Sequence, residues 1–130
     1  MEVFPSDTTA EELLEQNPDG IMLSPGPGDP ELLGYTVKTV KDLLGRVPIM
    51  GICLGNQVLA QALGGKTYKL KFGHRGANHP VLDVSTGRVY ITAQNHGYSI
   101  DPDSLPTEEE ISHISMNDQT DEGIRHRSIH

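Results

Sequence analysis

Several residue types are scarce in this chain of 130 residues, and each scarcity limits what the protein can be. Tryptophan is absent and aromatic residues make up 5%, so the core that this length allows must be aliphatic and modest. Ten basic residues stand against 18 acidic ones, and the net charge of −8 disfavours nucleic acid or an anionic membrane as a partner. No apolar run approaches the roughly 20 residues of a membrane span, and no basic-then-apolar leader opens the sequence. We therefore expect one domain whose partners are small molecules or proteins.

Cysteine occurs once, at Cys53, which excludes an internal disulfide and predicts a reducing, cytoplasmic compartment. The residue stands between Gly51 and Gly55, after a short β-branched run at 47–52 and before apolar residues with helical spacing at 54–63. This pattern predicts a sharp strand-to-helix turn, because glycine on both sides leaves the space that a Cβ would fill.

A cysteine in such a turn lies at the start of a helix. The first N–H groups of a helix have no intrahelical partner, and the helix dipole favours an anion near them. Both a thiolate and an oxyanion are stabilised at this position, so the pattern predicts a nucleophile at Cys53. The alternative is a small buried hydrophobic side chain at a strand end.

The first half of the chain alternates strand-like and helix-like segments. The expected elements are a strand stub at Val3-Phe4, a helix over 8–16, a strand over 21–23, a helix over 31–44, a strand over 47–52 and a helix over 54–63. Thr8 and Glu11 have the spacing of a capping box, and Gly45 is the expected helix stop. The alternation predicts a three-layer α/β fold with a mostly parallel central sheet flanked by helices.

The second half of the chain has short strand-like segments in place of the alternating strands and helices, and this pattern predicts a small antiparallel β-meander. Its expected strands are short and separated by turn residues, at 81–84, 88–92, 98–100, 111–116 and 123–126. The stretch 66–80 is basic and irregular. It is compatible with a positively charged surface near Cys53 and equally with a solvated loop.

Two further loops are expected to join Cys53 at the carboxyl ends of parallel strands, where ligands collect in α/β folds. The turn at 24–30 contains Gly26 and Gly28, which let the backbone approach a ligand closely; a plain Pro-Gly turn is the alternative. The other loop is at 94–98. Gln57 lies one helical turn past Cys53, so its amide can reach the space above the thiol.

Taken in this order, the three loops resemble those of the class I, or triad, glutamine amidotransferases. The matching residues are Ser24-Pro25-Gly26-Pro27-Gly28-Asp29-Pro30, Gly51-Ile52-Cys53-Leu54-Gly55-Asn56-Gln57 and Gln94-Asn95-His96-Gly97-Tyr98. Within that family, the segments 71–81 and 91–97 look like the small, glutaminase subunit of carbamoyl phosphate synthase. The resemblance runs over nearly the whole chain and implies a flavodoxin-like topology.

The resemblance also implies a reaction and a partner. Cys53 would attack the side-chain amide of L-glutamine, form a γ-glutamyl thioester and release ammonia to the large synthetase subunit, in a route to pyrimidines and arginine. No cofactor or metal is implied, and His126 with His130 lacks the third ligand that a metal site needs.

Each remaining site role comes from the resemblance by position. The Leu54 N–H, with a backbone N–H of the Gly26–Gly28 turn, would form the oxyanion hole. Four residues would hold the amino and carboxylate end of glutamine, namely Gln57, Asn95, Gly97 and Tyr98. Asn56 departs from the family pattern, where histidine is common, and we expect the change to be tolerated.

The catalytic base of the family is missing from these residues. Triad amidotransferases take it from a His-Pro-Glu motif, whereas the His-Pro present here, His79-Pro80, is followed by Val81. We therefore expect residues 1–130 to be a single partial amidotransferase domain, truncated at both ends, with weak turnover.

Three other interpretations remain. The chain can be a non-catalytic glutamine-binding or subunit-interface module, which the missing base favours. It can be another class I amidotransferase serving nucleotide or aromatic synthesis, although the segments 71–81 and 91–98 argue against that. A cysteine peptidase or thiol redox protein fits less well, because neither needs Gln57 and no second cysteine is present to resolve a disulfide.

Overall fold

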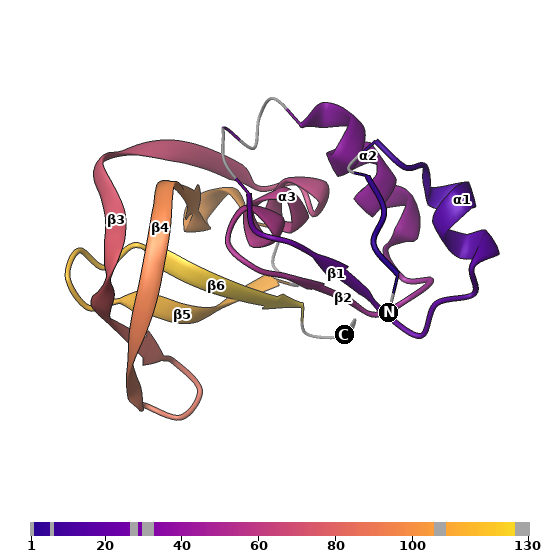
Figure 1. The fold of residues 1–130 in the computed structure, drawn as a ribbon. Helices are drawn as coiled ribbons and strands as arrows, with labels where there is room; N and C mark the ends of the chain where they lie inside the picture. Colours follow the sequence, from indigo (N-terminus) through magenta and orange to yellow (C-terminus); the bar gives the residue numbers. More distant parts are fainter. Residues whose placement is uncertain (1, 6, 27–28, 30–32, 106–108, 127–130) are drawn as a thin grey trace.

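The computed structural model describes residues 2–5, 7–26, 29, 33–105 and 109–126. Figure 1 shows the helices gathered at one end, next to a short parallel strand pair, and a larger antiparallel sheet at the other end. The helices are α1 (Ala10–Glu15), α2 (Gly34–Leu43) and α3 (Leu54–Ala62), and the parallel strands are β1 (Ile21–Leu23) and β2 (Ile49–Gly51). None of the described helices is both long and apolar enough to cross a membrane.

The predicted order of strands and helices is confirmed from residue 8 to residue 63, apart from small shifts of their ends. The strand over 21–23 is as predicted, and α3 ends one residue before the predicted Leu63. Part of the predicted helix over 31–44 lies outside the described residues, and its described part ends before Gly45, whose φ is +81°. The strand predicted at Val3-Phe4 is wrong. Both residues lie outside helices and strands, and Val3 is 89% exposed, so within the part of the chain that the structure describes they join neither sheet.

Helix α1 begins one residue later than the capping-box spacing predicts. Thr9 is the N-cap, and its hydroxyl accepts a hydrogen bond of 3.3 Å from the Glu12 N–H. The Thr8 hydroxyl instead donates to the Pro5 carbonyl at 2.7 Å. Both threonines precede a glutamate by three residues, so spacing alone does not distinguish the two possible caps.

The core lies between the helices and one face of the parallel strands. Val40, Val58 and Ala62 of α2 and α3 pack with Leu23 and Ile49 of the strands. A second cluster joins Ala10 of α1 to Leu43 and Val47. Because strand side chains alternate, Met22 and Met50 point to the other face, where they are 61% and 59% exposed.

The second half forms one antiparallel sheet whose strand order is β4-β3-β5-β6. Its strands are β3 (Lys66–Asp83), β4 (Val89–Asp101), β5 (Glu109–Ser115) and β6 (Asp121–His126), with a 3₁₀ turn at Pro102–Ser104 before β5. The chain therefore returns past β4 to pair β5 with β3, and the order differs from that of a simple meander, in which β5 would pair with β4.

Two sequence predictions for this region are wrong. The stretch 66–80 is strand rather than irregular chain, and the segment 94–98 lies inside β4 rather than in a loop after a parallel strand. The reason is that pairing of β3 with β4 shifts register twice, between Lys69 and His74 and between Gly76 and His79. Gly73 and Gly76 have φ values of +70° and +136° there, so the alternation that identifies a strand is broken.

The α/β class is confirmed, with a parallel pair and an antiparallel extension among the described residues. This arrangement brings α3, which follows Cys53, next to β4 and β6. The pocket described below lies between these elements.

Candidate active site

Cys53 lies in the sharp turn between β2 and α3, as the flanking glycines predict. Its φ of +57° and ψ of −114° are values that a non-glycine residue rarely adopts, a strain of about 1–3 kcal/mol that persists only where the surroundings impose it. The surroundings here are backbone. A Cβ on Gly51 would lie 2.5 Å from Gly55, and a Cβ on Gly55 would lie 2.2 Å from the Leu23 carbonyl oxygen. Glycine is therefore required on both sides of the cysteine.

Hydrogen bonds hold this turn against its neighbours. The Ile52 N–H donates to the Leu23 carbonyl of β1 at 3.0 Å, and the Gly55 N–H donates to the Ile52 carbonyl at 3.0 Å. The half-buried Cys53 thiol donates a long hydrogen bond of 3.8 Å to the Asn95 carbonyl of β4. Helix α3 thus begins with the thiol facing β4.

A second contact between α3 and β4 involves Gln57, one turn further along the helix. Its side chain is buried, with 6% exposure, and its Nε2 donates a 2.7 Å hydrogen bond to the Tyr98 carbonyl. The Gln57 amide therefore joins α3 to β4. Gln57 also lines the pocket, as Cys53 does.

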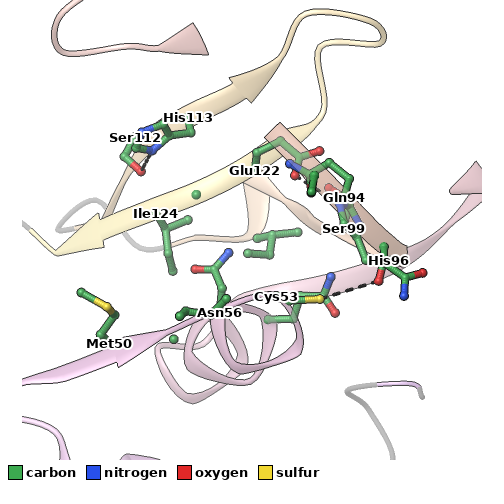
Figure 2. Close-up of a pocket in the computed structure, with 17 residues that line it drawn as sticks. Met50, Cys53, Asn56, Gln94, His96, Ser99, Ser112, His113, Glu122 and Ile124 are labelled. Carbon is green, nitrogen blue, oxygen red and sulfur yellow. Dashed lines mark hydrogen bonds and ion pairs between the residues drawn. The ribbon is translucent and has the colours of Figure 1, made fainter. Parts of the chain in front are cut away.

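The pocket has a volume of about 510 Å³, which is enough for an amino acid. Figure 2 shows Cys53 and Asn56 on its α3 side, with Glu122 and Ile124 of β6 across from them. Its lining comes from β2 and α3, β4, and β5 and β6: Met50, Gly51, Ile52, Cys53, Asn56, Gln57, Ala93, Gln94, Asn95, His96, Ser99, Ile100, Ser112, His113, Glu122, Gly123 and Ile124.

The predicted site residues divide into those that line this pocket and those that do not. Cys53, Gln57 and Asn95 line it together. Leu54, Gly97 and Tyr98 do not, although Leu54 starts α3 and the Tyr98 carbonyl binds Gln57. A Cβ on Gly26 would lie 3.3 Å from the Leu54 side chain, so Gly26 lies close to the start of α3. Gly28 lies outside the described residues.

A buried cluster of charged side chains beside the pocket was not predicted. We call it the Glu122 cluster and define it as Asp118, His74, Glu122 and His96. Asp118 Oδ2 lies 2.7 Å from His74 Nε2, and Glu122 lies between the two histidines, with Oε1 2.5 Å from His74 Nδ1 and Oε2 3.1 Å from His96 Nε2. The His74, Glu122 and His96 side chains are only 6%, 6% and 9% exposed.

The hydrogen-bond partners of His96 bear on the protonation of its ring. His96 Nδ1 lies 2.8 Å from the Tyr98 carbonyl oxygen and Nε2 faces the Glu122 carboxylate, and both partners only accept hydrogen bonds. Both contacts therefore favour the protonated form of His96. Burial alone would lower the pKa of His96, but the hydrogen bond and charge of Glu122 outweigh burial and raise it. Burial likewise opposes a low pKa at Asp118, but hydrogen bonds from His74 and Thr120 lower it to about 2.

The donor atoms of His74, His96 and Glu122 are of the kind that holds a divalent metal ion, and they lie within 4.8 Å of one another. Their spacing argues for an ion pair instead. Two ligands bound to one zinc ion at about 2.0–2.1 Å are separated by about 3.3 Å in tetrahedral geometry. The His74 Nδ1 and Glu122 Oε1 atoms are only 2.5 Å apart, so the side chains would have to separate before they could share an ion.

Sequence reasoning missed this cluster because its members come from distant parts of the chain. His74 lies in the middle of β3, His96 in β4, Asp118 in the turn after β5 and Glu122 in β6. No spacing rule links them. The antiparallel pairing of β3 with β4, which places His74 opposite His96, is the one signal that would have found half of it.

Nearly the whole chain matches a known protein family. Residues 1–129 match the family model described as glutamine amidotransferase class-I. The carbamoyl phosphate synthase small chain of Akkermansia muciniphila is 58% identical over 127 residues, which are 98% of this chain and 34% of that protein. The protein of the same name from Clostridium perfringens is also 58% identical over 127 residues, 98% of this chain and 36% of that one. The chain thus spans about a third of the length of these relatives.

Solved structures show the same fold at low sequence identity. A protein from Thermoplasma acidophilum described as a candidate GMP synthase component has a TM-score of 0.79 at 23% identity, covering 98% of this chain and 66% of that one. A glutamine amidotransferase from Thermotoga maritima has a TM-score of 0.67 at 21% identity, covering 88% and 56%. The predicted fold class is therefore confirmed by structure as well as by sequence.

Proposed function

Because the chain belongs to the class-I glutamine amidotransferase family, we propose that it forms the nucleophile and glutamine-binding part of a carbamoyl phosphate synthase glutaminase. One observation carries the proposal. Cys53 is held at a positive φ at the start of α3, facing a pocket of about 510 Å³ that Gln57 and Asn95 also line. A strained nucleophile at a helix start beside a pocket of this size suits attack on a small amide.

In the proposed reaction, the sulfur of Cys53 attacks the side-chain amide carbon of L-glutamine. The carbonyl oxygen becomes an oxyanion, which the Leu54 N–H and a backbone N–H of the Gly26–Gly28 turn stabilise. The C–N bond then breaks, the thiol proton passes to the leaving nitrogen, and ammonia departs from a γ-glutamyl thioester. Water hydrolyses the thioester to glutamate and restores the thiol.

Glutamine is held in this proposal by Gln57, Asn95, Gly97 and Tyr98. Carbonyl groups only accept hydrogen bonds, so a carbonyl beside the sulfur suits the N–H groups of a bound amide. The Asn95 carbonyl lies 3.8 Å from Sγ and is in a position to orient the leaving amide nitrogen. Gln57 supports the same strand through the Tyr98 carbonyl.

The ammonia is proposed to pass to a large synthetase subunit, which would use it for carbamoyl phosphate in pyrimidine and arginine synthesis. The names of the relatives support this partner, and the lone cysteine supports a cytoplasmic location. The 130 residues hold no His-Pro-Glu tripeptide, so we propose that this chain by itself binds glutamine and turns it over weakly.

Alkylation of Cys53 tests the proposal directly, because iodoacetamide can modify only one cysteine in this chain. L-glutamine is expected to slow the alkylation measured by mass spectrometry, whereas D-glutamine is not. Cys53→Ser should show no labelling. The proposal fails if L-glutamine at about 10 mM, ten times the upper end of the usual KM range, leaves the rate unchanged. Ammonia release at the rate of a complete amidotransferase would contradict the weak turnover.

A further inference from the structure

The Glu122 cluster forms a continuous path of contacts from the turn after β5 to the strand that faces Cys53. It runs from Asp118 through His74 and Glu122 to His96, in steps of 2.7, 2.5 and 3.1 Å. His96 continues it, since its Nδ1 donates to the Tyr98 carbonyl at 2.8 Å. The path therefore ends at the same carbonyl that accepts the Gln57 amide.

The segment of β4 at the end of this path has interrupted support from its strand partner. Regular pairing of β3 with β4 breaks on both sides of the three pairs that join 74–76 to 94–96. A segment with fewer ladder hydrogen bonds relies more on side chains for its position. Here those side chains are His96, held by Glu122, and Gln57, held in α3.

Two backbone carbonyls of β4, one in this segment and one just beyond it, contact the site. The Asn95 carbonyl accepts from the Cys53 thiol, and the Tyr98 carbonyl accepts from both Gln57 Nε2 and His96 Nδ1. The His96 ring thus holds the Tyr98 carbonyl directly, and His96 follows Asn95 in the chain. The ring in turn is fixed by Glu122, because its Nε2 donates to that carboxylate.

We propose that Glu122 is a positioning residue of the glutamine site: by bridging His74 and His96 it holds the Asn95 and Tyr98 carbonyls against Cys53 and Gln57. This inference rests on the proposed function. Glu122 also lines the pocket, but its role does not require contact with the substrate, because its carboxylate oxygens lie 2.5 and 3.1 Å from imidazole nitrogens of His74 and His96. A buried carboxylate beside His96 compensates the charge of the protonated ring, whereas a protonated His96 without Glu122 would carry an uncompensated charge.

Two substitutions separate position from charge. Glu122→Ala removes the bridge. Glu122→Gln keeps its shape, since the amide oxygen can take the place of Oε1 beside His74 Nδ1 while the amide nitrogen donates to a neutral His96 Nε2. His96 Nδ1 can then still donate to the Tyr98 carbonyl. The positioning role therefore predicts that glutamine, not alanine, at this position preserves the site.

The first measurement is protection of Cys53 from iodoacetamide by L-glutamine in the intact 130-residue chain. We expect Glu122→Ala to raise the half-protecting glutamine concentration at least about tenfold and Glu122→Gln to raise it less than about threefold. Glu15→Ala, the same change at an exposed position of α1, is the matched control and should leave protection unchanged. Equal protection in the wild type and Glu122→Ala overturns the positioning role alone, whereas an unprotected wild type overturns the proposed function first.

The second measurement is ¹⁵N NMR of histidine-labelled protein near neutral pH, which a merely structural role of Glu122 would not change in this way. His96 is expected to be doubly protonated in the wild type and to become a neutral Nδ1–H tautomer in Glu122→Gln. If Glu122→Ala does not fold, the comparison of the wild-type and Glu122→Gln spectra tests the proposal in its place. A His96 that stays doubly protonated in Glu122→Gln, or is neutral in the wild type, overturns the proposal.

Discussion

Gln57 and Tyr98 lie 41 residues apart in the sequence, and a 2.7 Å hydrogen bond from Gln57 Nε2 to the Tyr98 carbonyl joins α3 to β4. This bond connects the two halves of the molecule at the site itself. The helix that presents Cys53 belongs to the parallel part of the fold, whereas the strand that faces the thiol belongs to the antiparallel part. The candidate site therefore depends on the fit between the two parts.

Gln57→Ala should weaken both this fit and glutamine binding. The loss of one buried hydrogen bond is expected to lower the free energy of unfolding by about 1–2 kcal/mol, measured by urea denaturation. The half-protecting glutamine concentration at Cys53 should rise about tenfold, equivalent to about 1.4 kcal/mol. Gln16→Ala, at an exposed position after α1, is the control. An unchanged urea midpoint in Gln57→Ala would show that the bond does not hold α3 to β4.

Gly55→Ala should unfold or strongly destabilise the chain. Its Cβ would lie 2.2 Å from the Leu23 carbonyl oxygen, and backbone on both sides prevents an easy adjustment, so we expect a loss of about 3 kcal/mol or more. Gly34→Ala is the matched control, since a Cβ at that helical position meets nothing within 4 Å. This control should be neutral or stabilise the fold by up to about 1 kcal/mol. Similar midpoints for both variants in urea would contradict the tight turn.

The sharp turn at Cys53 could be predicted from the sequence because the need for glycine on both sides of it is local. Gly51 and Gly55 are needed by contacts within a few residues and by one neighbouring strand, and a strand-like run and a helix-like run border them. The same local logic predicted the order of elements up to α3. It could not choose between Thr8 and Thr9 as the cap of α1, since both have a glutamate three residues later.

The antiparallel strands β3 and β4 and the Glu122 cluster could not be predicted, because both depend on contacts between residues far apart in the sequence. The two long strands β3 and β4 are interrupted by bulges near Gly73 and Gly76, which remove the alternation that a strand shows in sequence. His74 and Glu122 are 48 positions apart by their numbers, and neither is unusual within its own segment. Only the folded sheet brings them into contact.

Asp118→Asn tests the outer end of the Glu122 cluster through pH. The folded pKa of Asp118 is lowered from 3.8 to about 2, so its contribution to stability is present above about pH 4 and is lost as pH falls through about 2. The side chain is 44% exposed, so solvent screening reduces that contribution to about 1 kcal/mol. Asp118→Asn should lower the free energy of unfolding by this amount at pH 5 and by less at pH 3. Asp103→Asn, at an exposed site, should show no such difference.

For His96 we expect the opposite dependence, a stability that falls as pH rises near neutral pH. Its folded pKa is raised, since Glu122 outweighs the effect of burial, so its protonated form stabilises the fold fully below the ordinary value of 6.5. That contribution is lost as pH rises through the raised value. Wild-type stability in urea should therefore fall as pH rises from 6 to 9, and Glu122→Gln should flatten the decline because it removes the charge that favours the imidazolium. Both chains are measured with Cys53→Ser as a shared background, so that the thiol is absent from both. Parallel pH profiles for the two chains would mean that Glu122 does not hold the proton on His96.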